Sequence, residues 1–203
     1  MDDIADAATM VSVRPHDRET PPTSLFQLAL GGDFDALPAP VQSLHTVQDR
    51  HSWTGRAKVT RGSSAFANLL CRLIGFPSER DETPLTVTIE RRDNKESWTR
   101  CFGSSEFRSV LSLRDSEGAG HIHERFGLMG FDINLQRAQD QLHFPVARGT
   151  LLGIPLPNWL LPRSEAMETA EGGRFQFDIT ISLPGIGLLV RYHGWLEPVR
   201  NDD

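Results

Sequence analysis

Cysteine is scarce in this sequence, and its spacing excludes two classes of small protein. Cys71 and Cys101 are the only cysteines, and they do not form a CxxC pair. The chain therefore lacks both the paired cysteines of a disulfide-stabilised scaffold and the clustered cysteines of a zinc module. We expect both thiols to be small buried side chains.

Targeting signals and membrane spans are also missing from the sequence. The stretch Met1–Ala5 has neither the basic start nor the apolar run of a secretory signal peptide. No segment of the sequence approaches the ~18 uninterrupted apolar residues of a transmembrane helix. These absences predict a cytoplasmic protein without a membrane span.

An excess of positive charge is absent as well. The formal net charge is −6 and the isoelectric point calculated from the sequence is about 5.6. A domain with this balance has no overall attraction for nucleic acid or for anionic lipid, although a local basic patch is compatible with it. We therefore expect no nucleic-acid partner.

The motifs that announce common cofactors do not occur. The sequence contains no phosphate-binding loop, no GxSxG elbow and no HExxH motif. The run Pro184–Leu188 has two glycines, but it lacks the third glycine and the following helix of a dinucleotide fingerprint. The sequence accordingly predicts no cofactor.

What the chain does have is enough apolar material for one domain. Its 203 residues are 38% hydrophobic, which suits a single core. Residues 1–22 mix acidic residues, proline and threonine without a period, so they predict a disordered tail. We expect one globular domain over residues 23–198 and a short C-terminal tail over residues 199–203.

Three short helices are predicted by capping residues and helical spacing. Leu25–Leu30 follows Thr23 and Ser24, which are good caps, and precedes two glycines. Pro40–His45 fits a second helix. Residues 64–75 predict the most apolar helix of the chain, because five large apolar residues recur at helical spacing before Gly75.

Period-two alternation of apolar residues predicts a sheet. The runs are 54–60, 85–90, 98–102, 107–113, 121–126, 131–135, 142–146, 174–183 and 188–197. Short strands joined by brief turns, each apolar on alternate residues, indicate an antiparallel sheet with one face in water. Because twist accumulates, a long sheet tends to curl or close.

We therefore predict an α+β fold. Its main element is a strongly curved antiparallel sheet of about eight or nine strands, half-barrel or barrel-like in shape. The sheet would pack around one or two apolar helices and would enclose helix 64–75.

Six segments also carry a resemblance to a known family. They are 26–37, 55–62 (GRAKVTRG), 98–103 (WTRCFG), 124–127 (ERFG), 153–157 (GIPLP) and 191–198 (RYHGWLEP). These segments resemble the bacterial family named domain of unknown function 4166, and the resemblance covers residues 24–198.

The resemblance implies a setting and a partner class. Members of that family often sit behind a nucleotide-binding oxidoreductase domain of the saccharopine-dehydrogenase type. An intracellular bacterial module associated with small-molecule metabolism is therefore implied, and an oxidoreductase is a candidate partner. The family supplies no catalytic residues to carry over.

A few charged residues alternate with apolar residues on the predicted inner face. Glu124 shares a strand face with Ile122 and Phe126, and Arg100 shares one with Trp98 and Phe102. A carboxylate among apolar neighbours needs a cation. We predict a catalytic set of Glu124, Arg100 and Arg191. The alternative, which we favour, is a purely structural ion pair.

Aromatic and basic side chains near the predicted concave face form the candidate ligand-binding set. It consists of Arg56, Trp98, Phe102, Phe126, Trp159, His193 and Trp195. The tryptophans fit core or rim packing better than ligand stacking. The uncharged, proline-rich stretch 151–162 cannot form a long helix, and we interpret it as an apolar lid over a cavity.

His121 and His123 place two imidazoles on one strand face, a spacing found in metal sites, with His143 or His193 as a third ligand. The same alternation puts Ile122 and Phe126 on the opposite face. If that face is the core, the histidines point to solvent. We favour this interpretation and predict no metal.

Two hypotheses of function follow. The first is a domain that binds a lipophilic small molecule in an apolar cavity, with acid/base isomerisation or cyclisation through Glu124 as an extension. The second is a non-catalytic domain that docks onto a separate oxidoreductase. A cavity of at least ~300 Å³ with convergent polar groups would favour the first. A filled core with an exposed apolar patch would favour the second. The sequence leaves open whether the protein is an enzyme.

Overall fold

The computed structural model describes residues 23–114 and 120–199. The predicted N-terminal tail, and all but the first residue of the predicted C-terminal tail, lie outside the described residues. No helix in the described ranges is both long enough and apolar enough to cross a membrane.

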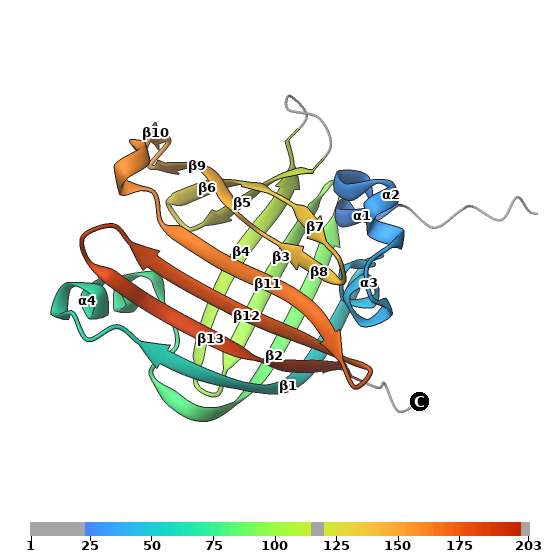
Figure 1. Cartoon of the computed structure of the whole chain (residues 1–203), viewed down its shortest axis with the longest axis horizontal. Helices are drawn as coiled ribbons and strands as arrows, with labels where there is room; N and C mark the ends of the chain where they lie inside the picture. The colour runs from blue at the N-terminus through green and yellow to red at the C-terminus, as the bar shows by residue number, and fades with distance from the viewer. Residues whose placement is uncertain (1–22, 115–119, 200–203) are drawn as a thin grey trace, which may run out of the picture.

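The described residues form one large sheet with a few short helices, an α+β arrangement dominated by β structure (Figure 1). The helices are α1 (Leu25–Leu30), α2 (Gly32–Asp35), α3 (Ala39–His45), α4 (Ala65–Ile74) and the 3-10 helix η1 (Asn158–Leu160). The strands are β1 (Arg50–Arg61), β2 (Arg80–Arg92), β3 (Lys95–Phe102), β4 (Ser105–Leu113), β5 (His121–Phe126), β6 (Met129–Asn134), β7 (Gln136–Ala138), β8 (Gln141–His143), β9 (Val146–Leu151), β10 (Ile154–Pro155), β11 (Arg163–Glu171), β12 (Arg174–Leu183) and β13 (Gly187–Pro198).

The strand order explains how the two halves of the chain meet. In the described residues the order is β10-β9-β6-β5-β4-β3-β2-β1-β13-β12-β11-β8-β7, and the neighbouring strands are antiparallel. β1 lies between β2 and β13, so it joins the first strands to the last. β10 and β7 are free edges, so the sheet is open, and of the two predicted shapes, half-barrel and barrel-like, the barrel-like one is wrong.

The sheet is open but strongly curved. β4 and β13 are four places apart in the strand order, which would separate them by about 19 Å in a flat sheet. Yet the rings of Phe107 on β4 and Tyr192 on β13 have centroids only 6.3 Å apart. In Figure 1 the strands β11–β13 accordingly cross in front of β3 and β4. The inner face of the sheet is thus folded around a shared core.

Two glycines permit a close approach where β1 meets β13. A Cβ added at Gly55 would collide with the backbone carbonyl of Trp195, and one added at Gly194 would collide with that of Arg56. A glycine within a strand commonly marks such a close backbone contact. Substitution of either residue would force the two strands apart.

The N-terminal helices close one end of the curved sheet. α1 begins with a capping box formed by Ser24 and Gln27, and α3 ends at His45. Phe26, Leu44 and His45 are completely or almost completely buried. The helices predicted at 25–30 and 40–45 are therefore confirmed.

Helix α4 forms where it was predicted but is not enclosed. Ser64 caps it, and Gly75, with φ +86°, ends it in the left-handed conformation. Only Ala67 and Cys71 of this helix are buried, whereas Phe66, Leu69 and Leu73 are 54%, 53% and 75% exposed. The prediction that the sheet encloses this helix is wrong, because α4 covers the end of the sheet opposite α1–α3 (Figure 1).

The predicted number of strands was too low. The described residues contain thirteen strands, and the prediction missed β7, β9, β10 and β11. β7 and β10 are too short, at three and two residues, to show a period. β11 is long, but the side chains that it turns inward are small or charged, so no apolar alternation marks it.

Candidate functional site

The inner face of the folded sheet lines a partly open cavity. Its volume is about 220 Å³, and it is lined from one side by β3–β6 and from the other by β11–β13. Most of its wall is apolar and includes Leu111, Ile122, Phe131, Ile133, Ile179 and Ile181. A small number of polar side chains interrupt this wall, namely His45, Arg100, Glu124, Ser164, Glu168 and Tyr192. An apolar cavity with a few converging polar groups is typical of a small-molecule site.

Arg100 and Glu124 meet inside this cavity. Arg100 points inward because it alternates with Trp98 and Phe102 along β3, and Glu124 reaches it from β5 across β4. Their closest atoms, Nη2 and Oε1, are 3.5 Å apart. The side chains are only 14% and 13% exposed, so both charges are largely removed from water.

The guanidinium of Arg100 has other partners besides Glu124. Its Nη1 donates a hydrogen bond of 2.8 Å to the hydroxyl of Ser109. It also lies over the rings of Trp98 and Phe107, at 4.9 and 5.4 Å from their centroids. These contacts hold the cation in place even without Glu124. The carboxylate, at 3.5 Å from its partner, is the less constrained member of the pair.

A second polar pair lies at the helical end of the cavity. The Nε2 atom of His45 on α3 is 2.6 Å from Oε2 of Glu168 on β11. The imidazole is completely buried, and its ring centroid is 3.7 Å from that of Phe26. Its other nitrogen, Nδ1, has no hydrogen-bond partner in the described residues. That nitrogen is therefore available to a ligand or a water molecule.

Glu96 lies behind this pair on β3. It is completely buried and accepts a hydrogen bond of 3.2 Å from the indole of Trp98. Burial raises the pKa of Glu96, against the opposing influence of His45 and of the Trp98 hydrogen bond. Its second oxygen, Oε1, has no partner within the described part of the chain. A raised pKa favours the neutral acid, which can donate as well as accept a hydrogen bond.

Tyr192 on β13 faces both of these charged pairs. Burial raises the pKa of Tyr192 to about 12, with Arg100 acting against the shift and Glu124 and Glu168 adding to it. Arg100, Glu124 and Glu168 line the same cavity as Tyr192. The phenol stays protonated at neutral pH and can therefore donate a hydrogen bond to a ligand of the cavity.

The buried phenol gives a prediction that can be tested directly, because Tyr192 is the sole tyrosine of the chain. In the native protein, ultraviolet absorbance of the phenolate should appear only near pH 12. In urea it should appear near the ordinary value of about 10. The folded state keeps a proton that the unfolded state loses, so this contribution to stability is lost as the pH rises through 10 to 12. Native-state titration near pH 10, with unchanged circular dichroism, would contradict the burial of this residue.

Several predicted site residues lie on the outer face of β13. Arg191, His193 and Trp195 alternate with Tyr192, which points inward, and none of the three lines the cavity. Arg191 instead pairs with Asp178 through two hydrogen bonds, the first of 2.9 Å from Nε. The structure therefore does not bring Arg191 together with Glu124, because Arg191, His193 and Trp195 share the face of β13 opposite to Tyr192.

The remaining predicted residues divide between the cavity and its surroundings. Trp98 and Phe126 line the cavity. Phe102 is buried below it, stacked on Phe107. Arg56 lies outside, half-exposed, and pairs with Glu82 at 3.5 Å.

The stretch 151–162 contributes to the cavity wall only in part. Leu156, Leu160 and Pro162 line the cavity, whereas Trp159 on η1 is 71% exposed and does not. The stretch therefore lies against the cavity with one side and faces solvent with the other. The ligand contact predicted for Trp159 is not present in this arrangement.

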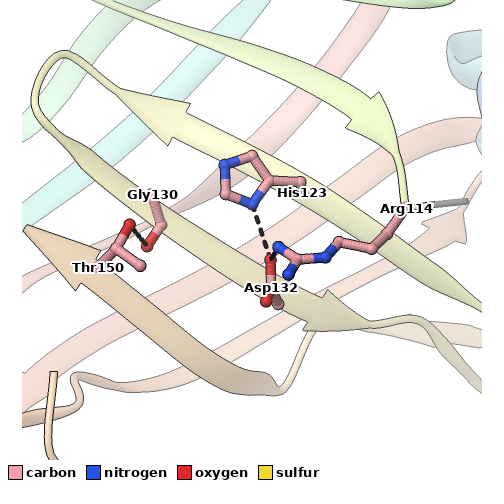
Figure 2. A network of polar contacts seen from close by, with 5 residues as sticks. All are labelled: Arg114, His123, Gly130, Asp132 and Thr150. Carbon is pink, nitrogen blue, oxygen red and sulfur yellow. Dashed lines mark hydrogen bonds and ion pairs between the residues drawn. The ribbon is translucent and has the colours of Figure 1, made fainter. Parts of the chain in front are cut away.

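His123, the second histidine of β5, takes part in a polar network on the outer side of the sheet. Nδ1 of His123 and Nη1 of Arg114 both approach Oδ1 of Asp132, at 2.7 and 2.6 Å (Figure 2). Asp132 is buried, so the two donors compensate its charge. No group of three His, Cys, Asp or Glu side chains in the described residues is arranged to hold a metal ion.

Four buried polar residues in or next to the cavity were missed from the sequence, although two of them, Glu96 and Tyr192, share a recognisable strand alternation. Glu96 shares the inward alternation of Trp98 and Arg100, and Tyr192 shares that of Val190 and Leu196. Nothing local marks Glu168, because β11 has no apolar alternation. His45 is four residues after the buried Val41, on the same helix face.

The arrangement suits proton transfer at a polar group of an apolar ligand. A carboxylate such as Glu124 can accept a proton from a carbon next to a carbonyl, and a guanidinium such as Arg100 can stabilise the negative oxygen that results. The His45–Glu168 pair is a second acid/base group that faces the same cavity.

The fold and the site together define a class of protein: an open, curved antiparallel-sheet domain with an apolar internal cavity and inward-facing charged pairs. The model of the family described as "Domain of unknown function (DUF4166)" matches residues 37–196, and the chain belongs to this family. The match confirms the family indicated by the sequence, although it begins at Leu37, where the first of the six similar segments ends. No curated protein and no solved structure matches the chain.

Proposed function

We propose that this domain binds a small, largely apolar molecule in its cavity and holds a polar group of that molecule at Arg100 and Glu124. The observation that carries the proposal is the apolar space of about 220 Å³ into which these two charges point. Charged side chains inside an apolar wall are costly for stability alone, which favours a role in binding or chemistry.

The size of the cavity restricts the ligand. A volume of about 220 Å³ is below the ~300 Å³ at the lower end of typical ligand pockets. The ligand is therefore compact, or its entry displaces Leu156 and Leu160 of the stretch 151–162. A neutral ligand fits best, because Glu124 and Glu168 disfavour further negative charge in the cavity.

Acid/base catalysis is the extension of this proposal. Glu124 acts as the base and Arg100 as the electrostatic stabiliser of an isomerisation or cyclisation. The alternative of a non-catalytic domain that docks onto a separate oxidoreductase needs a partner surface and makes no use of an internal cavity. The cavity is smaller than the ~300 Å³ that would favour binding, and the exposed apolar side chains of α4 and of the stretch 151–162 suit docking. The polar side chains that converge inside the cavity are what supports the binding role over this alternative.

Titration with a small, neutral, apolar fluorophore tests the binding role. The wild-type chain should enhance its emission in a saturable manner with one site per chain. Glu124→Gln should change the affinity of a fluorophore that carries a carbonyl group and leave that of a pure hydrocarbon nearly unchanged. Emission that rises without saturation would indicate only loose surface adsorption and would contradict the proposal.

A further inference from the structure

Exposed apolar side chains gather on the segments around one end of the cavity. The described residues include eleven exposed large hydrophobic side chains, and nine of them lie in three segments: α4, the β5–β6 turn, and the stretch from the end of β9 to η1. The most exposed are Leu73 at 75%, Trp159 at 71% and Ile154 at 69%. We call these three segments the cavity rim.

The same three segments line the cavity with their other side. α4 contributes Leu70 and Ile74 to the wall, and the turn is flanked by Phe126 and Met129, which also line it. Figure 1 shows α4 and β10 at the end of the molecule opposite α1–α3. The apolar surface of the rim is thus backed directly by the apolar wall of the cavity.

The rim also differs in charge from the rest of the chain. The rim segments themselves, residues 65–74, 127–128 and 151–160, contain Arg72 and no aspartate or glutamate, although the whole chain has a net charge of −6. Arg125, Arg148 and Arg163 flank these segments within three positions, and the one acidic residue equally close, Glu124, points into the cavity. The four arginines, Arg72, Arg125, Arg148 and Arg163, are exposed. Positive charge flanking an apolar surface is complementary to a layer of anionic phosphate groups above hydrocarbon.

We propose that the cavity rim docks the domain on the surface of a membrane that contains anionic phospholipid. Phe66, Leu73 and Trp159 enter the interfacial layer, where the amphipathic indole is favoured, and the arginines contact the phosphates. The negative charge of the rest of the molecule does not prevent docking, because salt screens it beyond about 8 Å. An apolar ligand of the cavity, which the proposed function supplies, then passes between bilayer and cavity without crossing water.

Flotation of the full chain with lipid vesicles tests this inference. The wild-type protein should float with vesicles of phosphatidylcholine and phosphatidylglycerol, and less with phosphatidylcholine alone or at high salt. A triple variant that carries Leu73→Ser, Leu152→Ser and Trp159→Ser should have a vesicle-bound fraction at least about tenfold lower than that of wild type. A second triple variant carries Arg72→Gln, Arg125→Gln and Arg163→Gln. Its vesicle-bound fraction should fall several-fold on anionic vesicles and stay at the wild-type level on phosphatidylcholine alone. Leu28→Ser is the matched control, because Leu28 is 49% exposed on α1, outside the rim, and should float like wild type.

The outcomes separate this inference from the proposed function. A wild-type chain that saturably binds the apolar fluorophore but does not float would overturn membrane docking and leave ligand binding intact. Equal flotation of the Leu73 triple variant and of wild type would also overturn it. A wild-type dimer that the Leu73 triple variant converts to a monomer, measured by sedimentation, would show instead that the rim is covered by a second copy.

Discussion

Glu124→Gln is expected to lower the free energy of unfolding by about 3 kcal/mol, because it leaves the buried guanidinium of Arg100 without its countercharge. The amide keeps the shape of the side chain, so packing in the cavity changes little. The remaining contacts of Arg100 to Ser109, Trp98 and Phe107 keep the loss at the lower end of the range for a broken buried pair. Urea unfolding at neutral pH measures the difference.

The chain offers a matched control for this substitution. Arg56 and Glu82 also approach to 3.5 Å, but their side chains are 53% and 66% exposed. Glu82→Gln should therefore cost no more than about 0.5 kcal/mol. If Glu124→Gln costs as little as the control but weakens ligand binding or turnover by ~100-fold, Arg100 does not need Glu124 as a countercharge and the carboxylate serves the ligand alone. If it changes neither stability nor binding, Glu124 is merely solvated.

Ala166→Phe is expected to abolish ligand binding. Ala166 lies on β11 opposite Ile179, and both line the cavity. A phenyl ring at this position occupies a large part of the available space, so affinity for an apolar ligand should fall by more than about 100-fold, a loss of at least ~2.7 kcal/mol. Overpacking should cost about 1–3 kcal/mol of stability.

The control for this variant is Ala147→Phe, which adds the same ring at an exposed position of β9. It should bind the apolar fluorophore like wild type. Thermal unfolding followed by circular dichroism shows that each variant is folded before binding is compared. Undiminished binding by a folded Ala166→Phe chain would place the ligand outside the cavity.

The cavity-lining residues of β3 and β5 could be predicted from strand alternation alone. Trp98, Arg100, Glu124 and Phe126 line the cavity as the period-two pattern predicts, because large apolar neighbours on the same face fix the phase of β3 and β5. In β13 the predicted site residues Arg191, His193 and Trp195 instead lie on the outer face of the sheet. There the outward Trp195 is as bulky as the inward Tyr192, so residue size does not distinguish the two faces.

Other parts of the site depend on contacts between distant segments. The His45–Glu168 pair joins residues 123 positions apart, and neither has a local pattern that indicates its partner. The position of α4 also depends on distant segments. Its apolar residues at helical spacing predicted a buried helix. The core is already closed by α1–α3 at one end and by the folded sheet, so most of α4 remains at the surface.

The most direct test of ligand binding in this cavity is native mass spectrometry of the full chain purified from its own host. We predict one non-covalently bound small molecule on the wild-type chain and on Ala147→Phe, extractable into organic solvent, and none on Ala166→Phe. An unliganded wild-type chain that also fails to take up apolar compounds from a host extract would contradict the proposal. So would an adduct that Ala166→Phe retains at the wild-type level.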